Sequence, residues 1–321
     1  MDKLFLSCDW GTSSFRLRLI DSVFSKQTGE SCSNEGVATI YNQWLQKNNA
    51  EEERLAFYQT VLKKHISNIE DQLKISLERM PVVVSGMASS SIGMKELPYK
   101  QLPVTVNIRD LHFEKLGATE NFKHDMIIVS GIRTDTDIMR GEEVQLMGCL
   151  IEKDQKQLFV FPGTHSKHVI VENGQITSFQ TYMTGEFFNL LSVNSILSKS
   201  ISIENVTGEE FNRPAFEKGV SDSLHTSLLH QSFMVRTNDL FQRFTKKENY
   251  WYLSGLLIGT ELKDLFETNS EVITIVSEGK FASLYETACN ILNKGKNVLS
   301  ADVNNALIKA HTLFAKQIQW K

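Results

Sequence analysis

Two segments of the chain share one pattern of apolar and polar positions, and they begin about 150 residues apart. Each reads as a short apolar strand, a Gly-Thr-x-Ser turn and a second strand, and they cover residues 4–20 and 158–171. In the first segment, Phe15, Leu17 and Leu19 alternate with two arginines, which is typical of a half-buried strand. We therefore expect a β-hairpin at each place.

Other apolar stretches predict the remaining elements of the first half. A third strand is expected at 37–41, and a long helix at 50–74 opens with three glutamates that suit the positive end of its dipole. Continuous apolar runs at 82–85 and 126–130 indicate strands buried on both faces. A helix at 142–152 then leads to the second hairpin.

The second half repeats this order. A third strand at 176–179 follows an Asn-Gly turn, and a helix begins near Gly185. After a helix at 251–266 and a buried strand at 272–276, two more helices close the chain. Residues 199–249 look largely helical and break the repeat, so we interpret them as an insertion.

Composition and charge narrow the class of protein. A length of 321 residues suits two domains, and a net charge of −4 argues against nucleic-acid binding. The four cysteines have no metal-site spacing and read as reduced thiols. The first apolar stretch reaches an acidic residue, Asp9, too soon to be a signal peptide. No apolar run is long enough to span a membrane. We expect a soluble cytoplasmic protein without a nucleic-acid or membrane partner.

The two hairpin turns carry the chemistry that binds phosphate. A glycine lets backbone N–H groups point inward, and neighbouring hydroxyl groups add donors, which together form an anion nest. The candidate phosphate-binding residues are Gly11, Thr12 and Ser13 in the first turn and Gly163, Thr164, Ser166 and Lys167 in the second. Lys167 either neutralises phosphate charge or is only a polar residue at the edge of a strand. We interpret His165 as a polar turn residue. Two such turns in equivalent places indicate a duplicated domain that holds a polyphosphate.

Six short motifs occur in an order that resembles one known family. They are Asp9-Trp10-Gly11-Thr12, Gly86-Met87, Met139-Arg140-Gly141-Glu142-Glu143, Pro162-Gly163-Thr164-His165-Ser166-Lys167, Met183-Thr184-Gly185-Glu186 and Leu253-Ser254-Gly255-Leu256-Leu257-Ile258-Gly259. Together they resemble the 2-dehydro-3-deoxygalactonokinase family of the sugar kinase, Hsp70 and actin superfamily, over nearly the whole chain.

The resemblance implies a fold and an activity. The fold would be α/β, with two ribonuclease-H-like (actin-like ATPase) domains and an interdomain cleft. Residues 1–140 would hold the sugar site, and residues 141–321 the nucleotide site and the helical insertion near 199–249. The activity would be phosphorylation of the terminal hydroxyl of 2-dehydro-3-deoxy-D-galactonate to the 6-phosphate, with ATP and Mg²⁺. A homodimer stays an open expectation.

Acidic residues are candidates for metal binding and for the base. Asp9 ends a strand and could hold Mg²⁺ through water, or it could accept N–H groups of its own turn. A kinase benefits from a carboxylate base beside the sugar hydroxyl, and related kinases keep this acid near the start of the helix after the sugar domain. Asp137 and Glu142 are the two candidates, although helix capping explains at least one of them.

The implied sugar acid needs a cation, and the planar fork of arginine binds carboxylate with two hydrogen bonds. Arg16, Arg133 and Arg140 are candidates, and we expect at least one of them to contact substrate. The loop after the strand at 82–85 is rich in hydroxyl groups, as a sugar site requires. Its candidate substrate-binding residues are Met87, Ser89 and Ser90.

The sequence says least about the residues that would bind the adenosine part of the nucleotide. The strand at 272–276 runs into Ser277 and Gly279, which resemble the adenosine loop of the superfamily. Gly255 and Gly259 stand four apart in an apolar helix, and we interpret them as packing residues. Motifs of other nucleotide-binding proteins and of common hydrolases are missing from the sequence. Two alternatives stay open: a kinase of another sugar or sugar acid on the same fold, and a nucleotide-gated binding protein.

Overall fold

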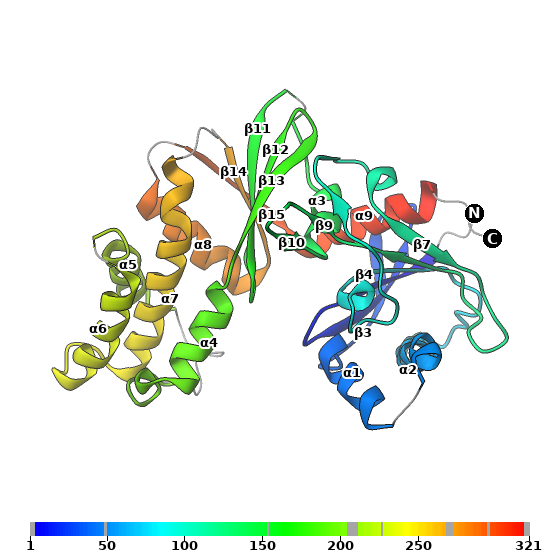
Figure 1. Ribbon diagram of the computed structural model, residues 1–321, viewed down its shortest axis with the longest axis horizontal. Coiled ribbons are helices and arrows are strands. Elements are labelled where there is room, and N and C mark those ends of the chain that lie inside the picture. The colour runs from blue at the N-terminus through cyan, green and yellow to red at the C-terminus, as the bar shows by residue number, and fades with distance from the viewer. Residues whose placement is uncertain are drawn as a thin grey trace. The chain divides into compact units, whose positions relative to one another are not determined.

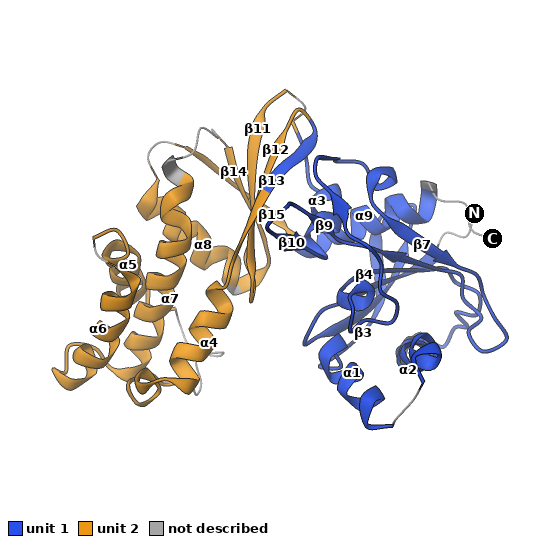
Figure 2. Cartoon of the chain, viewed as in Figure 1, with its two compact units in different colours: residues 1–151, 174–178, 303–321 blue, residues 152–173, 179–302 orange. Residues whose placement is uncertain are grey.

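The computed structural model describes residues 4–47, 50–152, 154–203, 211–225, 227–267, 272–293 and 296–317 (Figure 1). It confirms a mixed α/β fold. Its contacts divide the chain into two compact units (Figure 2). Unit 1 contains residues 1–151, 174–178 and 303–321, and unit 2 contains residues 152–173 and 179–302. The boundary expected at residue 140, and the interpretation of the units as two ribonuclease-H-like domains, stay predictions.

A six-stranded sheet forms the centre of unit 1. Its strands stand in the order β3 (Lys26–Ser33), β2 (Phe15–Asp21), β1 (Leu4–Trp10), β4 (Val82–Gly86), β8 (Met126–Val129) and β7 (Phe113–Leu116). Strand β1 pairs antiparallel with β2 and parallel with β4. The first hairpin and the two buried strands predicted from apolar runs are therefore confirmed.

Helices of unit 1 supply residues to both faces of this sheet. On one face, α1 (Val37–Gln46) and α2 (Arg54–Leu73) bury a core that includes Leu6 and Trp10 of β1. The short turn η1 (Glu51–Glu53) precedes α2, so the predicted helix at 50–74 is confirmed. On the other face, His311 of α9 (Val303–Gln317) lies with Nδ1 2.7 Å from Ser7 Oγ and Nε2 3.0 Å from Ser85 Oγ.

The predicted third strand at 37–41 is wrong, because these residues begin helix α1. Val37, Ile40 and Trp44 are its buried residues, which is helical spacing. The third strand is β3, which forms one edge of the sheet and has a mostly polar sequence. A polar edge strand carries no apolar signal, whereas the β-branched residues of α1 imitate a strand.

Shorter elements complete unit 1. They are η2 (Met87–Ser89), β5 (Lys100–Gln101), β6 (Val104–Thr105), η3 (Ile108–Asp110), β9 (Ile132–Arg133), β10 (Ile138–Met139) and α3 (Glu142–Met147). Strands β10, β9 and β5 form a second, three-stranded sheet. Helix α3 is shorter than the predicted helix at 142–152. It ends at Met147, and at the C-cap residue Gly148 an added Cβ would lie 1.8 Å from the carbonyl oxygen of Ala306.

The sheet of unit 2 repeats the strand order of unit 1. Its strands are β13 (Gln175–Tyr182), β12 (Ser166–Glu172), β11 (Lys156–Phe161), β14 (Val272–Ser277) and β15 (Asn297–Asp302). Strand β11 pairs antiparallel with β12 and parallel with β14, as β1 does with β2 and β4. The first residues of β13 belong to unit 1, in which Gln175 and Ile176 pair antiparallel with β6. The sequence predicted each of these strands except β15.

The helices of unit 2 are α4 (Thr184–Asn194), η4 (Ile196–Ser200), α5 (Arg213–Asp222), α6 (Leu228–Leu240), α7 (Lys246–Leu262), η5 (Lys263–Glu267) and α8 (Gly279–Leu292). Helices α5 and α6 fall inside the predicted insertion, of which residues 204–210 and 226 lie outside the described part. Gly255 serves packing, as interpreted from the sequence, since a Cβ there would lie 2.1 Å from the carbonyl oxygen of Phe216. Within the described ranges, no helix has the length and apolar character needed to cross a membrane.

Candidate active site

The first helix after the hairpin holds turn 1 (residues 11–14) of unit 1. The N–H of Ala38, in α1, donates to the carbonyl oxygen of Thr12 at 3.1 Å. Only glycine fits at position 36, because an added Cβ would lie 2.4 Å from that same oxygen. The side chains of Thr12 and Ser13 are exposed. Turn 1 is therefore fixed through its backbone, and its hydroxyl-bearing residues face solvent.

Turn 2 (residues 163–166) of unit 2 is held in the same way. The N–H of Glu186, in α4, donates to the carbonyl oxygen of Thr164 at 3.1 Å. A Cβ on Gly185 would lie 2.7 Å from the carbonyl oxygen of Gly163. In each unit, a glycine at a helix start thus packs on a Gly-Thr turn. The positive end of the helix dipole, which favours anions, accordingly lies beside each turn.

The other residues of turn 2, and Lys167 directly after it, interact within the protein. His165 is exposed, and its Nε2 lies 2.5 Å from Glu186 Oε2. The ammonium group of Lys167 donates to the carbonyl oxygen of His165 at 2.8 Å. Ser166 is fully buried. Of the predicted phosphate-binding side chains in this turn, Thr164 is the one that is exposed.

Asp9 is the last residue but one of β1, and it is partly exposed where β1 and β4 approach closely. In the register of β1 and β4, Gly86 follows the partner of Asp9 and has a φ of 85°. A Cβ on Gly86 would lie 2.7 Å from the carbonyl oxygen of Trp10 and 3.5 Å from Asp9 Oδ1. The described part of the chain has no cluster of three or more metal-ligating side chains. A single, partly exposed carboxylate fits Mg²⁺ that is bound mainly by water and phosphate.

The two candidate bases lie on neighbouring elements of unit 1. Asp137 lies between β9 and β10, where its N–H donates to Thr134 Oγ1 at 2.8 Å. Its own Oδ1 accepts the N–H of Ile138 at 2.7 Å. Glu142 is the first residue of α3. Asp137 therefore stabilises its own turn, whereas the N-cap of α3 is Gly141 and Glu142 is an acid of its first turn. Either acid remains a candidate base.

Glu143 is a titratable residue that the sequence reasoning did not select. Its carboxyl group is buried, and the N–H of Gly141 donates to its two oxygens at 2.9 and 2.7 Å. Burial, followed by the charge of Glu142, raises the pKa of Glu143 to about 8. Adjacent carboxyl groups in different environments are a recurring acid–base arrangement. The signal in the sequence was the pair of consecutive glutamates at the helix start.

The three candidate arginines have different surroundings. Arg16 Nη1 donates to Asn304 Oδ1 at 2.8 Å. Arg140 Nη1 donates to the carbonyl oxygen of Ser89 at 2.6 Å, and the guanidinium group lies over the ring of Tyr99. Arg133 is exposed and lies in β9. Strand β9 pairs with β10, and Asp137 lies in the turn between these two strands.

The hydroxyl groups of the predicted substrate loop make hydrogen bonds within unit 1. Ser89 is fully buried, and its hydroxyl group donates to the carbonyl oxygen of Val129 at 2.7 Å. Ser90 is buried as well, and its hydroxyl group donates to the carbonyl oxygen of Met87 at 2.7 Å. Met87 is partly exposed. The substrate contacts assigned to this loop stay predictions.

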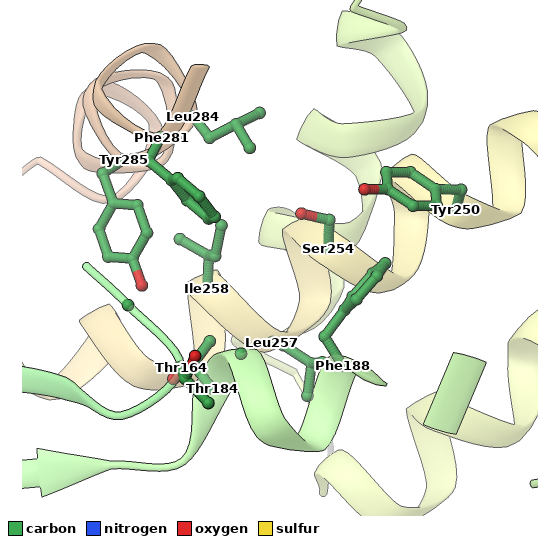
Figure 3. A pocket seen from close by; sticks show the side chains of 12 residues that line it. Thr164, Thr184, Phe188, Tyr250, Ser254, Leu257, Ile258, Phe281, Leu284 and Tyr285 are labelled. Carbon is green, nitrogen blue, oxygen red and sulfur yellow. The ribbon is translucent and has the colours of Figure 1, made fainter. Parts of the chain in front are cut away.

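A pocket of about 380 Å³ opens beside turn 2, entirely within unit 2 (Figure 3). It is lined by Gly163, Thr164, Thr184, Gly185, Phe188, Tyr250, Ser254, Leu257, Ile258, Phe281, Leu284 and Tyr285. The lining is mostly apolar and aromatic, as ligand pockets usually are. Ser277 ends β14 and Gly279 begins α8, the helix that supplies Phe281, Leu284 and Tyr285.

The sequence reasoning missed the walls of this pocket. On α7, the lining residues Tyr250, Ser254, Leu257 and Ile258 recur at helical spacing. The same spacing is typical of an ordinary core helix, so the sequence alone did not distinguish a pocket wall from core.

Comparison with known proteins identifies the family. The sequence model of 2-keto-3-deoxy-galactonokinases matches residues 9–310. The chain belongs to this family. It is 30% identical to the 2-dehydro-3-deoxygalactonokinase of Escherichia coli K12 over 233 residues, which cover 70% of this chain and 75% of that protein.

A further curated sequence and a solved structure agree. A probable 2-dehydro-3-deoxygalactonokinase of Rhizobium meliloti strain 1021, DgoK1, is 29% identical over 318 residues, with 94% of both chains covered. The crystal structure of a candidate 2-dehydro-3-deoxygalactonokinase from Sinorhizobium meliloti superimposes with a TM-score of 0.80 at 25% identity. That match covers 99% of this chain and 98% of the other. The predicted family is therefore confirmed.

Proposed function

We propose that this protein transfers the γ-phosphate of ATP to the terminal hydroxyl group of 2-dehydro-3-deoxy-D-galactonate and forms the 6-phosphate. The observation that carries the proposal is the family match over residues 9–310. The two Gly-Thr turns, and the apolar pocket beside turn 2, support it, since a nucleotide needs both kinds of site. The reaction would take place in the cytoplasm, where the four free cysteines stay reduced.

The turns would bind phosphate and the pocket would bind adenosine. Backbone N–H groups and exposed hydroxyl groups of Thr12, Ser13 and Thr164 are suitable donors to phosphate oxygens. The aromatic and aliphatic walls of the pocket match the apolar face of a purine. Ser277 and Gly279 would border this site at the start of α8.

Asp9, which is partly exposed, would hold Mg²⁺ through water. The bound ion would neutralise charge on the transferred phosphate. A carboxylate of Asp137 or Glu142 would accept the proton of the attacking hydroxyl group. Positioning and charge neutralisation would then supply most of the rate acceleration.

An arginine would bind the carboxylate of the sugar acid. Arg133 is the strongest of the three candidates, because its side chain is exposed and its Nε donates to Gln101 Oε1 at 2.7 Å in an exposed contact, while the contacts of Arg16 and Arg140 are half-buried. Arg133 also pairs with Ile138, the neighbour of Asp137. The pair of β9 and β10 would thus position both the arginine that binds the substrate carboxylate and the candidate base Asp137.

Substituting the three arginines one at a time tests this assignment. Arg133→Ala should raise KM for the sugar acid at least about 30-fold, because removing one partner of a desolvated charge pair costs about 2 kcal/mol or more. KM for ATP should change little. Arg16→Ala and Arg140→Ala should mainly reduce the free energy of unfolding.

The same proteins are then assayed with the analogue in which the carboxyl group is reduced to an alcohol. Wild type should prefer the acid, and Arg133→Ala should lose most of this preference. If Arg133→Ala keeps the wild-type preference, Arg133 does not read the carboxylate.

A further inference from the structure

A buried chain of polar groups lies beneath turn 2. The N–H of Gly163 donates to Ser166 Oγ at 3.3 Å, and Ser166 Oγ lies 3.0 Å from the hydroxyl oxygen of Tyr285. Tyr285 in turn donates to Glu261 Oε2 at 2.7 Å. Glu261, Tyr285 and Ser166 are each less than 4% exposed. The chain therefore connects α7 and α8 to the backbone of the turn without contacting solvent.

Glu261 anchors this chain with further donors. His168 Nε2 lies 2.9 Å from Glu261 Oε1, and the hydroxyl group of Thr184 donates to Glu261 Oε2. A buried carboxylate is costly unless it is hydrogen-bonded. These contacts come from β12, from the start of α4 and from α8, so one side chain of α7 holds three elements around the turn.

The directions of the hydrogen bonds follow from the number of protons. A carboxylate only accepts, and a tyrosine hydroxyl group has a single proton. Since Tyr285 gives that proton to Glu261, Ser166 must donate its own proton to Tyr285 Oη. Burial, followed by the charge of Glu261, keeps the pKa of Tyr285 well above its ordinary value, so the phenol stays a donor.

We propose that Ser166, Tyr285 and Glu261 are positioning residues, which set the backbone of turn 2 for phosphate from the protein side. The inference rests on the proposed function, because turn 2 must bind the phosphates of ATP. Phosphate would then be contacted by backbone N–H groups and by Thr164, not by the hydroxyl group of Ser166. Tyr285 also lines the pocket, so the same residue links the adenosine site to the phosphate turn.

A double-mutant cycle on Ser166→Ala and Tyr285→Phe tests the proposal, with the dissociation constant for MgATP measured by calorimetry. Each single variant should weaken ATP binding about tenfold, the scale of one hydrogen bond to or near a charged group. The double variant should bind about as weakly as the weaker single one, because both substitutions break one chain. Glu261→Gln, which keeps the size and one acceptor, should lose affinity less than Tyr285→Phe.

Tyr252→Phe is the matched control. Tyr252 is buried in the same unit, lies outside the pocket lining and donates to Asp222 Oδ2 at 2.9 Å. This variant should lose stability in urea as Tyr285→Phe does and keep wild-type affinity for ATP. Equal losses of ATP affinity in both tyrosine variants would show a general structural effect and overturn the proposal.

Additive losses in the cycle would also overturn the proposal, because they would mean that Ser166 contacts phosphate by itself. Unchanged ATP affinity in Ser166→Ala and Tyr285→Phe would do the same. ATP binding is measured without any sugar. Failure of the wild type to phosphorylate the sugar acid would therefore count against the proposed reaction and leave the result of the cycle intact.

Discussion

Gly185 lies directly on the backbone of Thr164: an added Cβ would be 2.8 Å from the Cα of Thr164. Gly36 has the same relation to Thr12, with 2.4 Å to its carbonyl oxygen. Each Gly-Thr turn is thus shaped by the helix that follows its three-stranded segment. The duplicated pattern in the sequence extends, in the structure, to the glycine that supports each turn.

Gly185→Ala should therefore disturb turn 2. The added methyl group must displace the turn, so we expect KM for ATP to rise about tenfold. Gly29→Ala is the matched control, since its methyl group meets Ile69 and Leu73 of helix α2 in unit 1 and overpacking of this kind costs about 1–3 kcal/mol of stability. It should lower the urea midpoint and leave KM for ATP near the wild-type value. An equal rise of KM in both variants would contradict the role of Gly185.

Asp9→Asn tests the proposed magnesium site. The exchange barely changes shape, so ATP should still bind, whereas kcat should fall about a hundredfold through loss of electrostatic stabilisation. The loss should be largest at limiting Mg²⁺, which a titration of rate against Mg²⁺ concentration would measure. Near-normal turnover at limiting Mg²⁺ would mean that Asp9 only stabilises its own turn.

Asp137→Asn and Glu142→Gln should separate the candidate bases. Removing a general base costs about a hundred- to ten-thousand-fold in rate. One variant should lose kcat on this scale and keep its affinity for ATP, while the other should change little. Steady-state rates with saturating ATP give the comparison. Small, equal losses would place the proton acceptor elsewhere.

Glu143 predicts a dependence of stability on pH. Its folded pKa, about 8, lies above the ordinary value of 4.5, so the folded protein binds a proton that the unfolded chain releases. The stabilisation is complete below about pH 4.5 and is lost as the pH rises to about 8, by at most about 1.4 kcal/mol per pH unit.

The test compares wild type with Glu143→Gln, which cannot titrate. Urea unfolding at pH 5, 6.5 and 8 should show that wild type loses stability relative to the variant as the pH rises. A constant difference between the two proteins would show that the Glu143 carboxyl group is not shifted.

The sequence predicted the features that depend on local pattern. Both turns, the buried strands β4, β8 and β14 and most helices follow from apolar periodicity and from Gly-Thr turns. The Thr245–Glu248 capping box, which begins α7 before the predicted residue 251, was also visible in the sequence but was overlooked.

Features that depend on tertiary contacts were missed. Strand β3 is an edge strand with a mostly polar sequence, so no apolar pattern marks it. The third strand was expected instead at residues 37–41, which begin α1. The contact between Tyr285 and Glu261 joins two helices, and no local pattern shows that both lie beneath Ser166. The burial of Ser89 likewise depends on Val129, 40 residues away. Long-range contacts of this kind decide which hydroxyl groups remain available to a ligand.

The most direct test of the account is the release of ADP by the purified protein with a panel of sugar acids and neutral sugars. The highest kcat/KM should be found with 2-dehydro-3-deoxy-D-galactonate, and phosphorus NMR should place the new phosphate on the terminal hydroxyl group as the 6-phosphate. Faster phosphorylation of glucose or another neutral hexose than of any keto-deoxy acid would contradict the account.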